Sequence, residues 1–333
     1  MASAKVRVKQ LLGEDSVRVL PPVVFPMVVA NYAARLAGEK LCRVIGDAEI
    51  LSRVLFSSYQ IFGYDLIMVF SDVLVEAEAM GCRVGVQEDE PPILERPAGE
   101  NGHLADPQRD GRMPVVLEAA RRLIQRVGED VFVLVSLKGP FSLASFLCGP
   151  ELFFEYLVEK PSAAEDFLRK ATESQKRYAQ AIVNIGGVPF IGDPMASGSI
   201  ISPKHFARFA LPYLKELVRK IHSFGVWTGL HICGDTKKFL KMMKETGANV
   251  LSIDEMDMAF VRKEIGADAV IMGNVSTRLI EQGRPADVRI AGAECLNKGL
   301  PKLILASACD VPVDAPVENV QALVKAARCW NGG

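Results

Sequence analysis

The sequence is poor in several features that would mark particular classes of protein. Its 333 residues include only four histidines and two tryptophans, and 39 basic against 40 acidic side chains leave a net charge of −1. Without an excess of positive charge, no field attracts phosphate groups, which argues against a general nucleic-acid binder. Hydrophobic residues still make up 49% of the chain, enough to bury a large core, so disorder is excluded.

Long hydrophobic runs are also missing. The best apolar stretch, residues 23–30, is interrupted by Pro26 and is much shorter than the roughly 18 residues that a membrane span needs. The first ten residues, MASAKVRVKQ, lack the apolar core of a secretory signal. We therefore expect a cytoplasmic protein without a membrane partner.

Cysteine is present in an odd number, seven, and the chain is long. This favours free thiols in a reducing compartment over a disulfide framework. Five of the cysteines fall in helical or loop-like stretches, and we expect them to be packing residues: Cys42, Cys82, Cys148, Cys295 and Cys329.

Short apolar runs alternate with amphipathic stretches along nearly the whole chain. Eight runs are strand-like: residues 19–25, 66–70, 131–137, 188–191, 226–231, 250–253, 269–272 and 303–306. Most are continuously apolar, as strands buried on both faces are. The alternation predicts a (β/α)8 TIM barrel forming a single domain over residues 1–333. An open doubly wound sheet is the alternative, but no G-x-G-x-x-G motif follows the first strand to support dinucleotide binding.

The pattern between the strands also makes local predictions. Ser202 and Pro203 are typical of a helix start, and Pro212 predicts a kink or a restart within the same helix. Residues 237–245, 286–297 and 316–328 are also helical in pattern. Residues 76–114 are rich in Glu, Asp, Pro and Gly. They predict a long excursion near the barrel mouth, with a hairpin around residues 81–86.

The strand ends carry the chemistry, because a barrel places its active site at their carboxyl-terminal face. His231 and Cys233 lie two residues apart, on one side of an extended strand, and Cys309 follows the eighth predicted strand. One imidazole and two thiolates form a zinc ligand set that leaves a coordination position open, as in catalytic zinc sites. The alternative is that these cysteines pack as small apolar residues.

Such a site suits attack by sulfur. A thiol bound to zinc is deprotonated, and the thiolate is the nucleophile. Two cysteine ligands add negative charge, which favours attack on a methyl group over polarisation of a carbonyl. At other strand ends, Asp72, Asp193 and Asn274 are candidate substrate contacts. The alternative for each aspartate is that it caps a helix or bonds loop amides.

At these residues the sequence resembles the uroporphyrinogen decarboxylase superfamily, closest to its methylcobamide:coenzyme M and related corrinoid methyltransferases. The resemblance covers most of the chain and is strongest from about residue 188 onward. It is carried by residues 191–206, 209–213, 231–235, 252–255, 272–275 and 308–319. It implies a (β/α)8 barrel with zinc on His231, Cys233 and Cys309. Asp254 or Glu255 is a candidate displaceable fourth ligand.

The resemblance also implies methyl transfer between a cobamide and a small substrate. The chain has no D-x-H-x-x-G cobalamin-binding motif, so a partner corrinoid protein is expected to supply the cobamide. In one direction a thiol such as coenzyme M, activated by Zn²⁺, attacks methyl–Co(III) and leaves Co(I). In the other, Co(I) takes the methyl group of a methoxyaromatic or another methyl donor. Both directions stay open.

Three alternatives remain. A uroporphyrinogen decarboxylase would need several cations for its substrate's carboxylates, yet residues 27–38, where the family has an arginine motif, keep only Arg35. Asp72 does match an acidic position of the decarboxylases, but the complete zinc set favours methyl transfer. A corrinoid-independent thiol methyltransferase resembling cobalamin-independent methionine synthase is the second alternative. A non-catalytic protein with a structural zinc is the third, although structural sites require four ligands.

Overall fold

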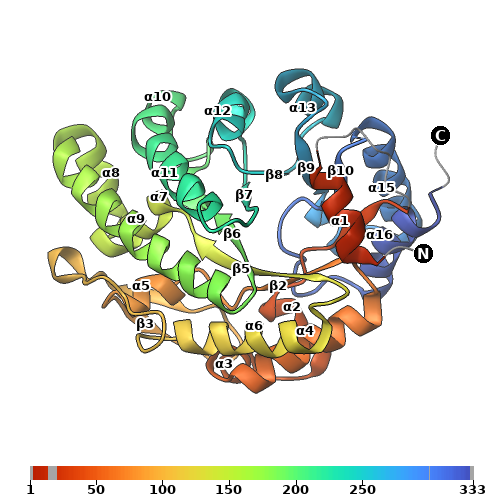
Figure 1. The fold of residues 1–333 in the computed structure, drawn as a ribbon, viewed down its shortest axis with the longest axis horizontal. Coiled ribbons are helices and arrows are strands. Elements are labelled where there is room, and N and C mark those ends of the chain that lie inside the picture. The colour runs from red at the N-terminus through yellow and green to blue at the C-terminus, as the bar shows by residue number, and fades with distance from the viewer. Residues whose placement is uncertain (1–2, 14–20, 300, 331–333) are drawn as a thin grey trace.

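The structure is a computed structural model that describes residues 3–13, 21–299 and 301–330. Its main sheet has eight strands in the order β1-β10-β9-β8-β7-β6-β5-β2, and the paired neighbours are parallel. The helices surround the strands (Figure 1). The predicted (β/α)8 barrel is thus confirmed as a nearly closed barrel. Its strands are β1(Val23–Phe25), β2(Leu66–Val69), β5(Phe132–Lys138), β6(Val188–Gly192), β7(Gly229–Ile232), β8(Val250–Ile253), β9(Val270–Val275) and β10(Leu303–Ser307).

Each of the eight predicted strands overlaps a strand of the barrel, with bounds that differ by a few residues. The first prediction began at residue 19, and residues 19 and 20 lie outside the described residues, whereas β1 begins at Val23. Every residue of β2, β8 and β10 is buried. Helices cover these strands outside and side chains fill the barrel inside, which explains why the apolar runs are continuous rather than alternating.

The three helices predicted between the strands are present. Residues 237–245 form η4(Lys237–Phe239) followed by α12, residues 286–297 lie in α15, and residues 316–328 correspond to α16. The α-helices are α1(Ala4–Leu12), α2(Ala30–Ala37), α3(Leu41–Gly46), α4(Ala48–Phe62), α5(Val75–Ala79), α6(Met113–Val127), α7(Pro140–Cys148), α8(Pro150–Glu159), α9(Pro161–Asn184), α10(Pro203–His205), α11(Leu211–His222), α12(Leu240–Glu245), α13(Met258–Ile265), α14(Thr277–Gln282), α15(Pro285–Gly299) and α16(Val317–Arg328).

The helix predicted to start at Ser202 is interrupted as Pro212 requires. The Ser202 hydroxyl caps α10 by accepting a hydrogen bond from the His205 N–H at 3.2 Å. A π-helical segment, η3(Phe206–Ala210), follows, and α11 restarts at Leu211. Because proline has no N–H, the ordinary ladder cannot continue through residue 212. The predicted restart is confirmed.

The excursion over residues 76–114 is anchored to the barrel mouth. Strands β3(Arg83–Gly85) and β4(Ile93–Arg96) form a hairpin whose first strand lies within the predicted residues 81–86 and whose second strand lies beyond them, and η1(Gly99–Asn101) follows. Between the two strands, the Glu88 carbonyl accepts from the Cys42 N–H at 2.9 Å. At the end of the excursion, Arg112 binds the carboxylates of Asp72 and Glu78.

At the seam between the first and last strands of the sheet order, a backbone hydrogen bond and a side-chain hydrogen bond take the place of a regular strand pairing. Strands β1 and β2 stand at the two ends of the sheet order. Between them, the Asp65 N–H donates to the Val24 carbonyl at 2.9 Å, and the Val24 N–H donates to Asp65 Oδ2 at 2.8 Å. The same carboxylate binds Arg7 of α1 and Arg328 of α16. One buried aspartate therefore joins helices α1 and α16 to the seam.

The cysteines outside the site follow the packing prediction only in part. All seven are free, and Cys82, Cys148 and Cys295 are buried. Cys42 is half-buried, and Cys329 is exposed directly after the last turn of α16, so the prediction was wrong for Cys329.

Within the described residues, no single helix is long and apolar enough to cross a membrane. Helices α7 and α8 taken together would be long and apolar enough, but the pair is bent by 106° at the break between the two helices.

Candidate functional site

The three predicted zinc ligands line one cavity at the carboxyl ends of the strands. His231 lies in β7, Cys233 directly follows it, and Cys309 follows β10. All three line a cavity of about 190 Å³, together with Lys138 and Asp310. Much of the remaining wall is apolar: Met27, Met68, Phe70, Val73, Phe190 and Pro194. Barrel closure therefore brings together residues that lie far apart in the sequence.

The imidazole of His231 has one engaged and one free nitrogen. Nδ1 lies 3.0 Å from the hydroxyl oxygen of Ser252, which is fully buried in β8. Nε2 is buried and has no hydrogen-bond partner among the described residues. Burial lowers the pKa of His231 to about 4, against the opposing effect of the Asp254 charge. The ring is therefore neutral near pH 7, and Nε2 is the atom left for a ligand.

The two thiols share this environment. Burial raises the pKa of Cys233, and the charge of Asp254 acts in the same direction. Burial also raises the pKa of Cys309, with further contributions from Asp310 and from Cys233 itself. The contribution of Cys233 to the pKa of Cys309 is consistent with their place on the wall of the same cavity. Both are protonated at neutral pH unless a cation offsets these effects.

These residues fit a zinc ion by their chemistry. A neutral imidazole with a free, buried nitrogen and two thiols on one cavity wall are the donors that zinc takes with an open position. As the side chains stand, no group of three or more His, Cys, Asp or Glu residues in the described part of the chain could hold a metal ion. Zinc binding therefore stays a prediction.

The two candidate fourth ligands differ in position. Asp254 accepts the Gly234 N–H at 2.6 Å, and its charge affects the pKa of His231, Cys233 and Cys309. Gly234 sits at a φ of 77°, so the chain turns sharply after Cys233. Glu255 is exposed, and its carboxylate accepts the Ser276 hydroxyl at 2.7 Å. Asp254 is therefore the carboxylate nearer to the predicted ligands.

Two of the predicted substrate contacts hold loops in place and are absent from the wall of this cavity. Asp193 is fully buried, and its Oδ1 accepts the Ser142 N–H at 2.7 Å and the Ser142 hydroxyl at 2.6 Å. A Cβ on Gly139 would lie 2.1 Å from Asp193 Cγ, which explains the glycine before α7. Asn274 Nδ2 donates to the Asp254 carbonyl at 2.9 Å. Substrate contact by these two residues stays a prediction.

The third predicted contact, Asp72, is paired with Arg112. One Asp72–Arg112 contact measures 3.2 Å between Oδ1 and Nη2, and a second joins Oδ2 to Nη1. Asp72 also accepts the Leu74 N–H at 2.9 Å. It lines a second cavity, of about 270 Å³, that shares Phe70 and Asp310 with the first. Asp72 thus borders the path into the site.

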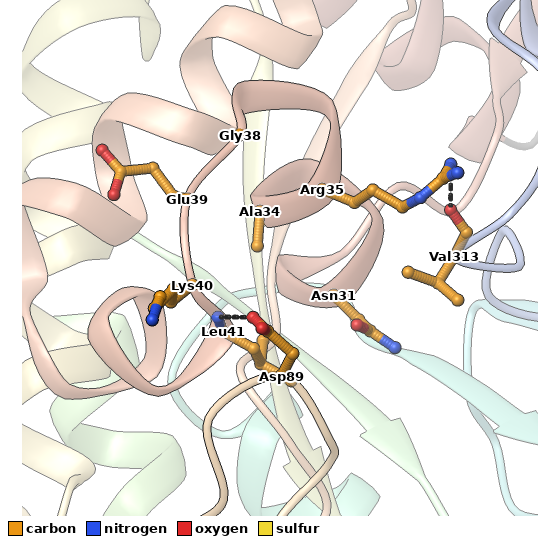
Figure 2. Close-up of a pocket in the computed structure, with 9 residues that line it drawn as sticks. All are labelled: Asn31, Ala34, Arg35, Gly38, Glu39, Lys40, Leu41, Asp89 and Val313. Carbon is orange, nitrogen blue, oxygen red and sulfur yellow. Dashed lines mark hydrogen bonds between the residues drawn. The ribbon is translucent and has the colours of Figure 1, made fainter.

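A third cavity extends this path toward the surface. It has a volume of about 320 Å³ and shares Asn31, Leu41 and Val313 with the second cavity. Figure 2 shows Arg35 at its edge, where the guanidinium donates to the Val313 carbonyl at 3.0 Å. Arg35 also pairs with Asp314 at 3.2 Å. The three cavities form a series from the predicted ligands outward.

Two residues of the site were missed by sequence reasoning. Lys138 is the last residue of β5 and is only 3% exposed, and Asp310 follows Cys309. Burial raises the pKa of Asp310 to about 6, while the positive charge of Lys138 opposes that change. The available signal was a lysine at the end of a long apolar strand, FVLVSLK, at the active face of a barrel.

Comparisons relate the chain to known proteins. The family model described as uroporphyrinogen decarboxylase (URO-D) matches residues 6–330. A methylated-thiol–coenzyme M methyltransferase of Methanosarcina mazei is 30% identical over 85% of this chain and 77% of its own. A methylcobamide:CoM methyltransferase of Methanosarcina barkeri is 31% identical over 84% of each chain. The solved structure of a methyltransferase from Methanosarcina mazei superimposes with a TM-score of 0.90 at 27% identity, covering 98% of each chain.

Proposed function

Because this chain belongs to the uroporphyrinogen decarboxylase family, we propose that it is a zinc-dependent methyltransferase acting between a corrinoid and a small thiol such as coenzyme M. The relatives named as CoM methyltransferases support corrinoid-dependent methyl transfer. The observation that carries the zinc proposal is the buried, unpartnered Nε2 of His231, in the same cavity wall as Cys233 and Cys309. A partner protein supplies the corrinoid.

Each residue has a separate task in this mechanism. His231, Cys233 and Cys309 would hold Zn²⁺, which when bound lowers the pKa of a substrate thiol and keeps it as thiolate at neutral pH. Ser252 orients the His231 ring through Nδ1. Asp254 fixes the turn after Cys233 by accepting the Gly234 N–H. The apolar wall keeps water away from the nucleophile.

The atoms and electrons of the methyl transfer are accounted for by the thiol and the methylated corrinoid alone. The substrate thiol releases its proton to solvent as it becomes thiolate. The thiolate sulfur then attacks the methyl carbon of methyl–Co(III), a sulfur–carbon bond forms, and the cobalt–carbon bond breaks with both electrons staying on cobalt as Co(I). The cavity, at about 190 Å³, is below the 300–1,000 Å³ typical of pockets for drug-sized ligands. The small thiol therefore binds inside, and the macrocycle of the partner approaches from the mouth.

Transfer in the opposite direction is the second candidate. Phe70 and Phe190 make part of the wall aromatic, which suits a methoxyaromatic donor whose methyl group passes to Co(I). Decarboxylation of a porphyrinogen is less well supported. A porphyrinogen carries several carboxylates, but Lys138 is the one lysine or arginine among the described residues lining the cavity of His231, Cys233 and Cys309. Arg35, in the third cavity, is already paired with Asp314.

The test is a methyl-transfer assay with free methylcobalamin and added Zn²⁺. We expect the absorbance change from methyl–Co(III) to Co(I) with a thiol, and a methyl thioether detected by mass spectrometry. A second arm offers Co(I) and methoxyaromatics and detects methyl–Co(III). Product in the second arm alone would reverse the proposed direction.

Variants test the ligand set in the same assay. Cys309→Ser is expected to lose bound zinc and to lower the rate by more than about 100-fold, because a metal ligand matters more than its supporting residues. Cys148→Ser, at a buried cysteine of α7 outside the cavity, is the matched control and is expected to keep its zinc. Unchanged zinc content in Cys309→Ser would remove Cys309 from the site.

A further inference from the structure

Lys138 carries a buried charge without a partner. Its side chain ends β5, is 3% exposed and lines the cavity that contains His231, Cys233 and Cys309. The ammonium nitrogen lies 4.5 Å from the centroid of the Phe70 ring. Within the described residues it makes no hydrogen bond, and no carboxylate lies within the 4.0 Å of an ion pair. The nitrogen is not among the side-chain atoms that are sealed off without a partner, so the ammonium is accessible from the cavity, and an anionic ligand there would pair with a charge that the surrounding protein leaves without a counter-ion.

Nearby carboxylates attract this charge without contacting it. The positive charge of Lys138 opposes the effect of burial on the pKa of Glu76, Asp193 and Asp310. Asp193 is already bonded to Ser142, and Glu76 accepts the backbone N–H of Lys138 itself at 2.7 Å. The three N–H donors of the ammonium are therefore left for a group inside the cavity.

We infer that Lys138 is a specificity-determining residue that binds an anionic group, sulfonate or carboxylate, at the end of the substrate remote from the reacting sulfur. The inference rests on the proposed function for the thiol end and adds the residue that recognises the other end. Lys138 and the predicted zinc ligands line the same small cavity, so one short molecule contacts both at once. Holding the substrate at two points orients its sulfur for attack.

A purely structural role makes the opposite prediction for stability. If Lys138 served to neutralise Glu76, Asp193 and Asp310, then Lys138→Met would leave three buried carboxylates without a nearby cation, and its melting temperature would fall well below wild type. If instead the ammonium has no counter-ion until a ligand binds, Lys138→Met removes an unpaired charge from the cavity wall. Its melting temperature is then equal to or above that of wild type, since methionine fits an apolar wall.

The direct experiment measures binding of anions that have no thiol. Calorimetry is done on the full chain, with and without Zn²⁺, using ethanesulfonate and propionate, which distinguish sulfonate from carboxylate recognition. Wild type binds at least one of them, and Lys138→Met weakens binding by about 10- to 100-fold, as expected for a hydrogen bond to a charged group. Lys138→Arg keeps the charge and retains part of the affinity. Lys40→Met, at an exposed lysine that lines the third cavity, is the control, and its anion binding is expected to be unchanged.

Activity provides a second readout. With methylcobalamin, the ratio of kcat/KM for 2-mercaptoethanesulfonate or 3-mercaptopropionate over neutral 2-mercaptoethanol falls by the same factor in Lys138→Met. Equal anion binding by wild type and Lys138→Met, with both folded, overturns the inference. If no thiol is methylated while anion binding still depends on Lys138, the proposed function fails and the anion site stands.

Discussion

At the scale of single residues, the site depends on how the two nitrogens of His231 are used. Ser252 engages Nδ1 at 3.0 Å, and Nε2 is left buried and unpartnered. Burial lowers the pKa of the ring to about 4, so the imidazole stays neutral through the physiological range. A neutral ring fixed from behind is the state in which histidine binds a metal.

Ser252→Ala tests this orientation. Without the hydroxyl, Nδ1 loses its partner and the ring loses its fixed direction, so we expect zinc affinity to fall by about 10- to 100-fold. Chelator competition measures this affinity. Ser307→Ala is the matched control, because Ser307 is equally buried, ends β10 and bonds the Met27 N–H instead of His231. Equal losses of affinity in both variants would contradict the orienting role.

At the scale of elements, strand ends could be predicted and their side-chain partners could not. Apolar runs of limited length locate β7 and β10, and topology then brings His231, Cys233 and Cys309 to one mouth. The pairing of Asp72 with Arg112 depends on where the excursion over residues 76–114 returns, which no periodicity encodes. Lys138 was missed for a related reason, since only the packed barrel shows that its ammonium is enclosed.

Glu76 links three elements and predicts a pH dependence of stability. Its buried carboxylate, on α5, accepts the Lys138 N–H of β5 at 2.7 Å and the Gln175 amide of α9 at 3.4 Å. Burial raises its pKa above the ordinary 4.5, with the Lys138 charge opposing. The Glu76 carboxyl therefore holds its proton more tightly in the folded state than in the unfolded state. The contribution of Glu76 to the free energy of unfolding is most favourable below pH 4.5, and it is lost as the pH rises through the pKa of the folded state.

Glu76→Gln removes this ionisation while keeping an oxygen acceptor. The free energy of unfolding of the variant, relative to wild type, is expected to increase with pH by up to about 1.4 kcal/mol per pH unit between the unfolded and folded pKa values. Urea denaturation over a pH series measures it. Glu173→Gln, on the exposed side of α9, is the control with no such trend. If the difference in free energy of unfolding between Glu76→Gln and wild type did not change with pH, Glu76 would have the same pKa in the folded and unfolded states.

At the scale of the whole molecule, the barrel is held shut where its first and last elements meet. Helices α1 and α16 appear near each other in Figure 1, and each contributes an arginine, Arg7 and Arg328, that binds Asp65. Asp65 is 1% exposed and also accepts the Val24 N–H at the seam between β1 and β2. Because the carboxyl mouth is built from the same strands, closure of this seam also positions the candidate site.

Asp65→Asn is expected to destabilise the whole barrel. The substitution leaves Arg7 and Arg328 buried or half-buried without a counter-charge, so the free energy of unfolding should fall by about 3–5 kcal/mol, the cost of breaking a buried ion pair from one side. Asp268→Asn is the control: its side chain is 76% exposed and its carboxylate lies 3.3 Å from the Lys244 ammonium, and an exposed pair contributes at most about 1 kcal/mol. Urea midpoints compare the two variants. A loss as small for Asp65→Asn as for Asp268→Asn would mean that backbone bonds, and not this charge cluster, close the seam.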